Sequence, residues 1–174
     1  MLSEIQEITK SLAPRLIEIR RHIHAHPELS GQEYQTAAYV AGVLSSCGLR
    51  VQEAVGKTGV VGDLSSEKNQ EKILAIRTDM DALPIQEKTD LDFASRKPGI
   101  MHACGHDVHT TLGLGVAMVL SRLSQPLPQT IRFIFQPAEE IAQGASWMVQ
   151  DGVMRDVQAI FGVHVFPSLS LIHI

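Results

Sequence analysis

The stretch Ile131-Arg132-Phe133-Ile134-Phe135-Gln136-Pro137-Ala138-Glu139-Glu140 decides the fold class. Its first half is a near-continuous apolar run, which is typical of a strand buried on both faces of a sheet. A proline ends this run, and two consecutive glutamates follow it. Open α/β sheets bind their ligands beyond the carboxyl ends of their strands. The stretch therefore predicts an α/β protein with a functional site at one edge of its sheet.

The rest of the chain alternates between short apolar runs and amphipathic segments. We expect strands over residues 49–55, 59–64, 72–77, 131–136 and 159–165, and helices over 5–23, 32–46, 110–123 and 145–150. Pro14 should kink or divide the first helix, and Gly48 should close the second. A loop rich in glycine and proline is expected from Asp79 to Asp107. This order predicts a three-layer α/β sandwich with a mostly parallel central sheet that is buried on both faces.

Composition places the chain among ordinary globular proteins. Its 174 residues are 44% hydrophobic and 20% charged, with a net charge of −4, which favours one domain. No basic run is present, so we expect neither a nucleic-acid partner nor a membrane surface. The two cysteines, and a start that lacks the features of a secretory signal, favour a reducing, cytoplasmic location. Eight histidines, against only three tryptophans and tyrosines, point to a functional site.

The segment Met101-His102-Ala103-Cys104-Gly105-His106-Asp107-Val108-His109 concentrates side chains that bind metals. A thiolate and an imidazole are good ligands for zinc and other borderline transition metals. Gly105 lets the backbone turn tightly between Cys104 and His106. The alternative is a small buried cysteine beside histidines that cap a helix, but the density of such side chains favours a metal site.

Three further groups of polar side chains follow predicted strands. Asp79 and Asp81 come after the third strand and, taken alone, favour a turn with solvated carboxylates. Glu139 and Glu140 point in different directions because they are adjacent, so one can bind a metal while the other transfers protons. They also suit the first turn of a helix. His164 lies near the end of the last strand, at the same predicted sheet edge, which favours a role in the same site.

Other candidate side chains are predicted to lie outside the site. Cys47, near the end of an apolar helix, is interpreted as a core or boundary thiol. His22, His24 and His26 recur at a spacing of two, which does not form one face of a helix. We interpret these histidines as boundary polar residues, although the segment His26-Pro27-Glu28-Leu29 could pack against the site.

Five motifs, in this order along the chain, resemble those of the M20 metallopeptidase family in its amidohydrolase branch. They are His26-Pro27-Glu28-Leu29-Ser30, Asp79-Met80-Asp81-Ala82-Leu83-Pro84, residues 101–109 as quoted above, Gln136-Pro137-Ala138-Glu139-Glu140 and Gly162-Val163-His164-Val165. The likeness runs from about Ile17 to Ser168. The branch includes hippurate hydrolases, N-acyl-amino-acid amidohydrolases, auxin-conjugate hydrolases and N-acetyl-diaminopimelate deacetylases. The resemblance implies an incomplete catalytic domain of a zinc-peptidase-like fold.

The resemblance implies a two-metal hydrolase that cleaves the amide bond of a small N-acyl amino acid or dipeptide-like substrate. The implied metal ligands are Cys104, His106, Glu140 and His164. Glu139 would be the general base, and Asp81 and His109 would orient the ligands. Asp79 stands where other branches carry a ligand histidine. Two divalent ions are expected, zinc or manganese, with nickel or cobalt also compatible.

Two other hypotheses remain open. The protein could be a non-catalytic relative that binds metal without turnover, although Glu139, which binds no metal in the implied scheme, argues against it. Alternatively, Cys104 could be a nucleophile with His106 or His109 as its base. A cysteine hydrolase would survive removal of metal by a chelator, whereas a metal-dependent one would not.

Members of the family are longer than this chain. We expect residues 1–168 to be the N-terminal part of the catalytic domain. The inserted lid or dimerisation domain, the rest of the catalytic domain and a fifth ligand, a histidine, would lie outside the chain. Residues 169–174 are expected to be a non-native tail, because they depart from the family pattern and match the translation of a widely used transposase adaptor end. We therefore expect this chain alone to be inactive, and the full-length form to be a homo-oligomer.

Overall fold

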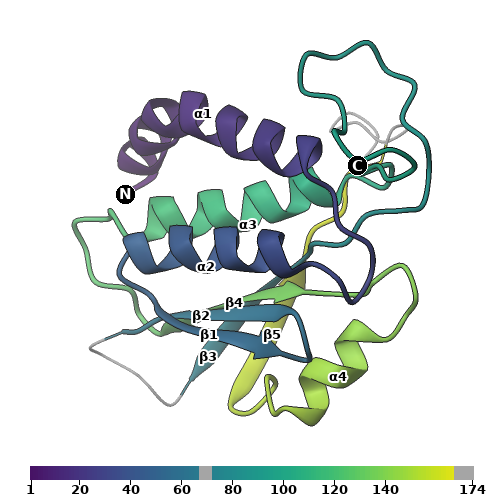
Figure 1. Ribbon diagram of the computed structural model, residues 1–174. Coiled ribbons are helices and arrows are strands. Elements are labelled where there is room, and N and C mark those ends of the chain that lie inside the picture. The colour runs from purple at the N-terminus through teal and green to yellow at the C-terminus, as the bar shows by residue number, and fades with distance from the viewer. Residues whose placement is uncertain (67–71, 167–174) are drawn as a thin grey trace.

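Helices lie on both faces of a five-stranded sheet in the computed structural model, which describes residues 1–66 and 72–166 (Figure 1). The elements are α1 (Leu2–Ala25), α2 (Tyr34–Ser46), β1 (Arg50–Val55), β2 (Gly59–Leu64), β3 (Ile73–Asp79), α3 (His106–Leu120), β4 (Thr130–Gln136), α4 (Gly144–Gln150) and β5 (Val157–Gly162). Helices α2 and α3 lie next to one face of the sheet, α1 lies along α3, and α4 is on the opposite face. The predicted three-layer α/β arrangement is confirmed. The tail 169–174 lies outside the described residues.

The first helix is not divided at Pro14. Helix α1 runs from Leu2 to Ala25 with the proline inside it. A proline in a helix interior costs about 3 kcal/mol, because it removes one backbone hydrogen bond. Leu12, Ile19 and Ile23 are all buried in the main core. Burial of each such side chain contributes about 1.5–3 kcal/mol, so packing outweighs the cost of the proline and one helix results.

The sheet is mixed, and the prediction of a mostly parallel sheet is wrong in this respect. Its strand order is β1-β2-β4-β3-β5. The pairings of β3 with β4 and with β5 are parallel, whereas β1–β2 and β2–β4 are antiparallel. Strands β1 and β2 are joined by a tight turn in which Gly56 and Lys57 have φ of 60° and 78°. A turn this short can only connect antiparallel neighbours.

Burial differs between the centre and the edges of the sheet. Strands β2 and β4 are almost wholly buried, as predicted, and Phe133 and Phe135 in β4 are fully enclosed. Strand β5 is an edge strand and is largely exposed; its Phe161 is 61% exposed. The prediction that the sheet is buried on both faces is therefore wrong for β5. Within residues 1–66 and 72–166, no helix is both long and apolar enough to cross a membrane.

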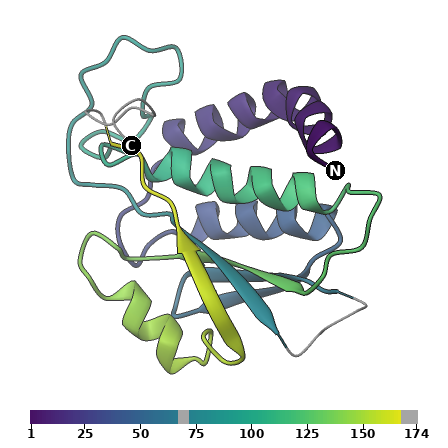
Figure 2. The same ribbon diagram turned by 180° about the vertical axis from the view of Figure 1, so that it is seen from behind.

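The carboxyl ends of β3, β4 and β5 lie at one edge of the sheet, beside the start of α3 (Figure 2). Helix α3 begins at His106, four residues before the predicted start. Gly105 precedes it with φ of 85°, and its carbonyl accepts the backbone N–H groups of Val108 and His109. The glycine therefore starts the helix inside the histidine-rich motif, which the sequence had placed in a loop.

A buried ion pair connects two neighbouring strands at the centre of the sheet. Arg132 of β4 donates from Nε and Nη2 to the two carboxylate oxygens of Asp63 in β2, at 2.8 and 2.9 Å. Arg50 of β1 adds a third bond of 3.0 Å. Burial opposes ionisation of Asp63, but the hydrogen bonds from the two arginines outweigh it and lower the pKa of this carboxyl.

We predict that Asp63→Asn lowers the free energy of unfolding by about 3–5 kcal/mol at neutral pH, because it removes the negative charge opposite Arg132, whose side chain is only 13% exposed. The pKa of Asp63 is lower in the folded than in the unfolded state, so its stabilisation is present above the ordinary pKa and disappears as pH falls through the folded-state value. Urea denaturation from neutral to acid pH measures both effects.

The matched control is Arg50→Gln, since the Arg50 side chain is 73% exposed and its bond is worth less than about 1 kcal/mol. An equal loss of stability in both variants would contradict the assignment of the stabilisation to the buried pair.

Candidate metal centre

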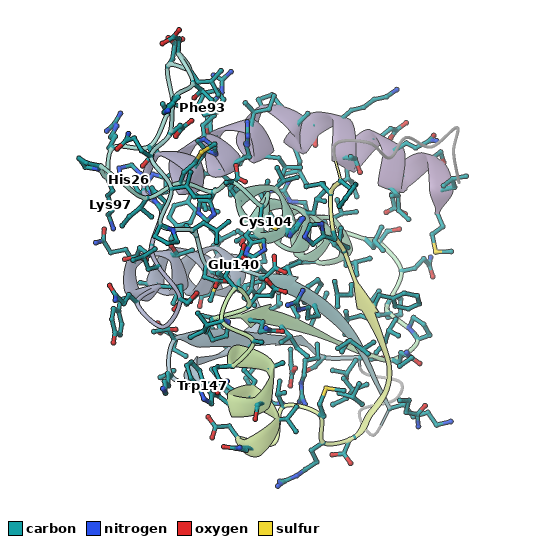
Figure 3. The ribbon with its side chains drawn as sticks, turned by 90° about the vertical axis from the view of Figure 1, so that its right-hand side faces the viewer. His26, Phe93, Lys97, Cys104, Glu140 and Trp147 are labelled. Atoms are coloured by element: carbon teal, nitrogen blue, oxygen red, sulfur yellow. The ribbon has the colours of Figure 1, made fainter. Side chains whose placement is uncertain are left out.

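The structure brings together all the predicted site residues from four segments of the chain. Asp79 ends β3 and Asp81 follows it; Cys104 precedes α3; His106 and His109 lie in its first turn; Glu139 and Glu140 follow β4; and His164 follows β5. Three sets of donor atoms each lie within 4.8 Å of one another. They are Cys104, His106 and His164; Asp79, His106 and His109; and His106, Glu139 and Glu140. Figure 3 shows Cys104 and Glu140 close together near the centre of the molecule.

His106 lies at the centre of these sets, and its side chain is fully buried. Its Nδ1 donates a hydrogen bond of 2.8 Å to the backbone carbonyl of Asp81. This bond places the proton on Nδ1, so the neutral ring presents the lone pair of Nε2 to the site. Nε2 lies 3.7 Å from Glu140 Oε1 and 3.8 Å from Glu139 Oε2. Among the described residues, neither His106 Nε2 nor Glu140 Oε1 has a hydrogen-bond partner, although both are buried.

The pKa values of the Cys104 thiol and the Glu140 carboxyl are both raised. Burial, together with the negative charge of Glu140 and Glu139, raises the pKa of the Cys104 thiol to about 11. Burial also raises the pKa of the Glu140 carboxyl, which outweighs the opposing effect of His106. The Sγ atom lies 3.5 Å from Nε2 of His164. The site therefore combines an excess of negative charge with donor atoms of three chemical types.

Two aspartates, Asp79 at the end of β3 and Asp81 just after it, are buried. The interpretation of this motif, taken alone, as a turn with solvated carboxylates is therefore wrong. Both Asp79 and Asp81 are at most 1% exposed. Asp81 Oδ2 accepts hydrogen bonds from Ser30 Oγ at 2.6 Å and from the backbone N–H of Glu140 at 3.0 Å. Burial opposes its ionisation, but the His106 ring, whose Nδ1 lies 3.3 Å from Oδ1, and the hydrogen bonds from Ser30 and the Glu140 backbone outweigh it and hold the pKa of Asp81 at about 2. Its charge is therefore stabilised by the protein itself.

His109 connects the end of β3 to the segment that carries His164. Its Nδ1 donates to Asp79 Oδ1 at 2.6 Å, and its Nε2 accepts the backbone N–H of Val165 at 2.8 Å. Both ring nitrogens are thus engaged with protein groups. His109 therefore holds Val165, the residue next to His164, in place.

His24 is not a boundary residue, and that interpretation is wrong. It is 3% exposed, and its two ring nitrogens lie 2.9 Å from Asp107 Oδ2 and 3.1 Å from Glu87 Oε1. Arg20 also donates to Asp107, at 2.8 Å. The spacing of the three histidines could not predict these contacts of His24. Its partners Asp107 and Glu87 come from α3 and from the loop between β3 and α3, far from α1 in the sequence. Cys47 packs against the core, as predicted.

Comparison with known proteins agrees with this geometry. The sequence profile of peptidase family M20/M25/M40 matches residues 75–174. The chain belongs to this family. The "Probable hydrolase" of Synechocystis is 71% identical to this M20 chain over 166 residues, which are 95% of this chain and 42% of that protein. N-acetylcysteine deacetylase of Bacillus subtilis is 47% identical over 161 residues, which are 92% of this chain and 42% of the relative.

Solved structures share the fold of this M20 chain. The crystal structure of Bacillus subtilis YXEP protein, described as a dinuclear metal binding peptidase from the M20 family, superposes with a TM-score of 0.87 and 46% identity. The match covers 92% of this chain and 45% of that one. The chain thus spans less than half the length of the relatives it matches.

We predict that His109→Phe, which keeps a ring at this position, releases the segment after β5. The change removes the acceptor for the Val165 N–H and the donor to Asp79, so the free energy of unfolding should fall by about 1–3 kcal/mol. Amide hydrogen exchange at Val165 should accelerate. Thr111→Val is the control, since in the part of the chain that the structure describes the Thr111 hydroxyl donates within α3, to the Asp107 carbonyl. Unchanged exchange at Val165 in His109→Phe would contradict the role assigned to His109.

Proposed function

We propose that the protein that carries this chain is a metal-dependent amidohydrolase that cleaves the amide bond of N-acyl amino acids. The observation that supports it most directly is a pair of buried atoms, His106 Nε2 and Glu140 Oε1, which lie 3.7 Å apart and have no hydrogen-bond partner among the described residues. Leaving such atoms buried without partners is costly, and a bound cation would satisfy both. Membership of the M20 family gives the reaction class.

The donor set fits two divalent ions. In the proposed site, Cys104, His106, Glu140 and His164 would hold them. A thiolate, imidazoles and a carboxylate together suit zinc, and manganese, nickel and cobalt are also compatible. Bound ions of this kind lower the pKa of a water molecule and polarise the scissile carbonyl.

The two adjacent glutamates divide the work in this proposal. The Glu140 side chain is 18% exposed and held at the site by its backbone bond to Asp81, which suits a ligand. The Glu139 side chain is 39% exposed, and its Oε2 lies close to His106. Glu139 therefore has access to both solvent and site, and acts as the general base that takes a proton from the attacking water and delivers it to the leaving nitrogen.

The proposed substrate class is a small N-acyl amino acid or a dipeptide-like molecule. The B. subtilis relative is named for the deacetylation of N-acetylcysteine, and the relative from Geobacillus stearothermophilus is named an N-acyl-L-amino acid amidohydrolase. Both cysteines are free thiols, which persist most readily in a reducing compartment, and this supports the proposed cytoplasmic location. A homo-oligomer is proposed for the full-length protein, which acts without a nucleic-acid or membrane partner.

We predict that Glu139→Gln and Glu140→Gln have different effects in the product of the complete open reading frame. Glu139→Gln should keep the metal content while kcat falls by about 10²–10⁴-fold, the contribution expected of a general base. Glu140→Gln should lower metal occupancy. Metal analysis and steady-state kinetics on N-acetyl, N-benzoyl and N-indoleacetyl amino acids measure both. An equal loss of metal in the two variants would contradict the division of roles.

We also predict that Cys104→Ser weakens metal binding, because a hydroxyl is a poor replacement for a thiolate ligand. Activity should return in part when excess metal is added, and a chelator should abolish activity in the unmodified enzyme. Cys47→Ser is the matched control and should leave metal content unchanged. Normal metal binding with no activity at any metal concentration, or activity that survives chelation, would instead support the hypothesis of a cysteine nucleophile.

A further inference from the structure

A buried glutamate outside the site, Glu33, holds the backbone from which Glu139 and Glu140 project. Glu33 is fully buried at the start of α2. Its Oε1 accepts the backbone N–H of Ala138 at 2.8 Å and that of Gly31 at 2.9 Å. Its other oxygen accepts a hydrogen bond from the Thr58 hydroxyl. One carboxylate thus joins the start of α2, the β1–β2 turn and the segment after β4.

The Ala138 backbone is strained and tightly enclosed. Ala138 has φ of 50°, in the left-handed region that a residue with a Cβ rarely adopts. Its carbonyl accepts the N–H groups of Gln143 and Gly144, at 3.2 and 3.1 Å. A Cβ on Gly144 would lie 1.6 Å from the Pro137 carbonyl oxygen, so only glycine fits there. Such a conformation persists only when the surrounding contacts enforce it, and Glu33 supplies the contact to the Ala138 N–H.

The direction of the two site glutamates depends on this turn. Glu139 and Glu140 follow Ala138 directly, and the Glu140 N–H is then held by Asp81. Together, Glu33 and Asp81 hold backbone N–H groups of two residues that flank Glu139. A rotation of the backbone at Ala138 would move both carboxylates away from His106.

We propose that Glu33 is a positioning residue for the metal centre: by holding the strained Ala138 backbone, it aims Glu139 and Glu140 at His106. The inference rests on the proposed function, since it concerns how that site is assembled. Nothing in the reaction requires Glu33 itself to contact metal or substrate. Its action is geometric.

The chain offers a matched control in Glu28, a second buried glutamate in the same segment. Glu28 is 6% exposed and accepts hydrogen bonds from the Gln35 and Thr36 N–H groups and the Thr36 hydroxyl. It therefore resembles Glu33 in burial and in the number of its hydrogen bonds. In the described structure its carboxylate makes none of these bonds to the segment after β4.

A conservative variant separates geometry from charge. In Glu33→Gln, the amide oxygen can accept the N–H groups of Ala138 and Gly31. The amide NH₂ can donate to the Thr58 hydroxyl, which rotates to accept. This variant should preserve the turn although it removes the charge, whereas Glu33→Ala leaves the Ala138 N–H unpaired.

The experiment compares Glu33→Ala, Glu33→Gln and Glu28→Ala in the product of the complete open reading frame. Cobalt(II) is the probe, and its visible absorption spectrum and its dissociation constant, from chelator competition, are read alongside kcat and the midpoint of urea unfolding. We expect both alanine variants to unfold at lower urea. Only Glu33→Ala should weaken cobalt binding, by about 10–100-fold as for other groups that support metal ligands, with an altered spectrum and a lower kcat. Glu33→Gln should match the unmodified protein in spectrum.

Equal cobalt affinities and spectra in Glu33→Ala and Glu28→Ala, or a Glu33→Gln variant as defective as Glu33→Ala, would overturn the inference. If Glu33→Ala does not fold, Glu33→Asp replaces it, since the shortened carboxylate should still weaken cobalt binding more than Glu28→Ala does. If the unmodified protein binds cobalt but hydrolyses no N-acyl amino acid, the proposed function fails while the cobalt comparison still tests Glu33.

Discussion

The concentration of negative charge around the buried imidazole of His106 is the constraint on which the rest of the site depends. Burying carboxylates near one another is unfavourable unless each is compensated. Asp79 is compensated by Arg77, whose Nη1 donates to it at 2.6 Å, and by His109. Asp81 is compensated by the hydrogen bonds that Ser30 and the Glu140 backbone donate to Oδ2, and by the His106 ring 3.3 Å from Oδ1. Among the described residues, the only basic side-chain nitrogen within 4.0 Å of the Glu139 or Glu140 carboxylate is Nε2 of His106, at 3.8 and 3.7 Å. The protein thus neutralises its two aspartates and leaves the charge of its two glutamates available to a cation.

The mixed sheet explains how these groups meet. Strands β3, β4 and β5 run parallel, so the residues that follow them meet at one edge. The antiparallel strands β1 and β2 extend the sheet on the side away from β5. Their turn contributes Thr58, which bonds to Glu33. Strands β1 and β2, which depart from the predicted parallel arrangement, therefore support the site through Thr58 but supply none of the predicted site residues.

Backbone geometry distinguishes two neighbouring side chains of identical chemistry, Glu139 and Glu140. Glu139 and Glu140 differ in their surroundings because the turn at Ala138 points one carboxylate inward and leaves the other more accessible. Gly105, with φ of 85°, does the same for the histidine-rich motif: it separates Cys104 in the loop from His106 in the helix. A Cβ at Gly105 would also lie 2.5 Å from Val165, next to His164. Both turns require a positive φ, which glycine adopts freely at Gly105 and which surrounding contacts must enforce at Ala138.

The sequence by itself determined the α/β class, the order of the elements and the identity of the residues gathered at the sheet edge. These follow from local signals: apolar runs such as 131–135, helical periodicity in α1, and polar clusters placed directly after strands. Only the tertiary structure decided that Asp79 and Asp81 are buried, that His24 joins Asp107 and Glu87, and that Glu33 reaches Ala138. The partners in these contacts are separated by up to 105 positions. Periodicity reports which face of an element is buried, whereas the partner of a buried polar group depends on which other segment packs against it.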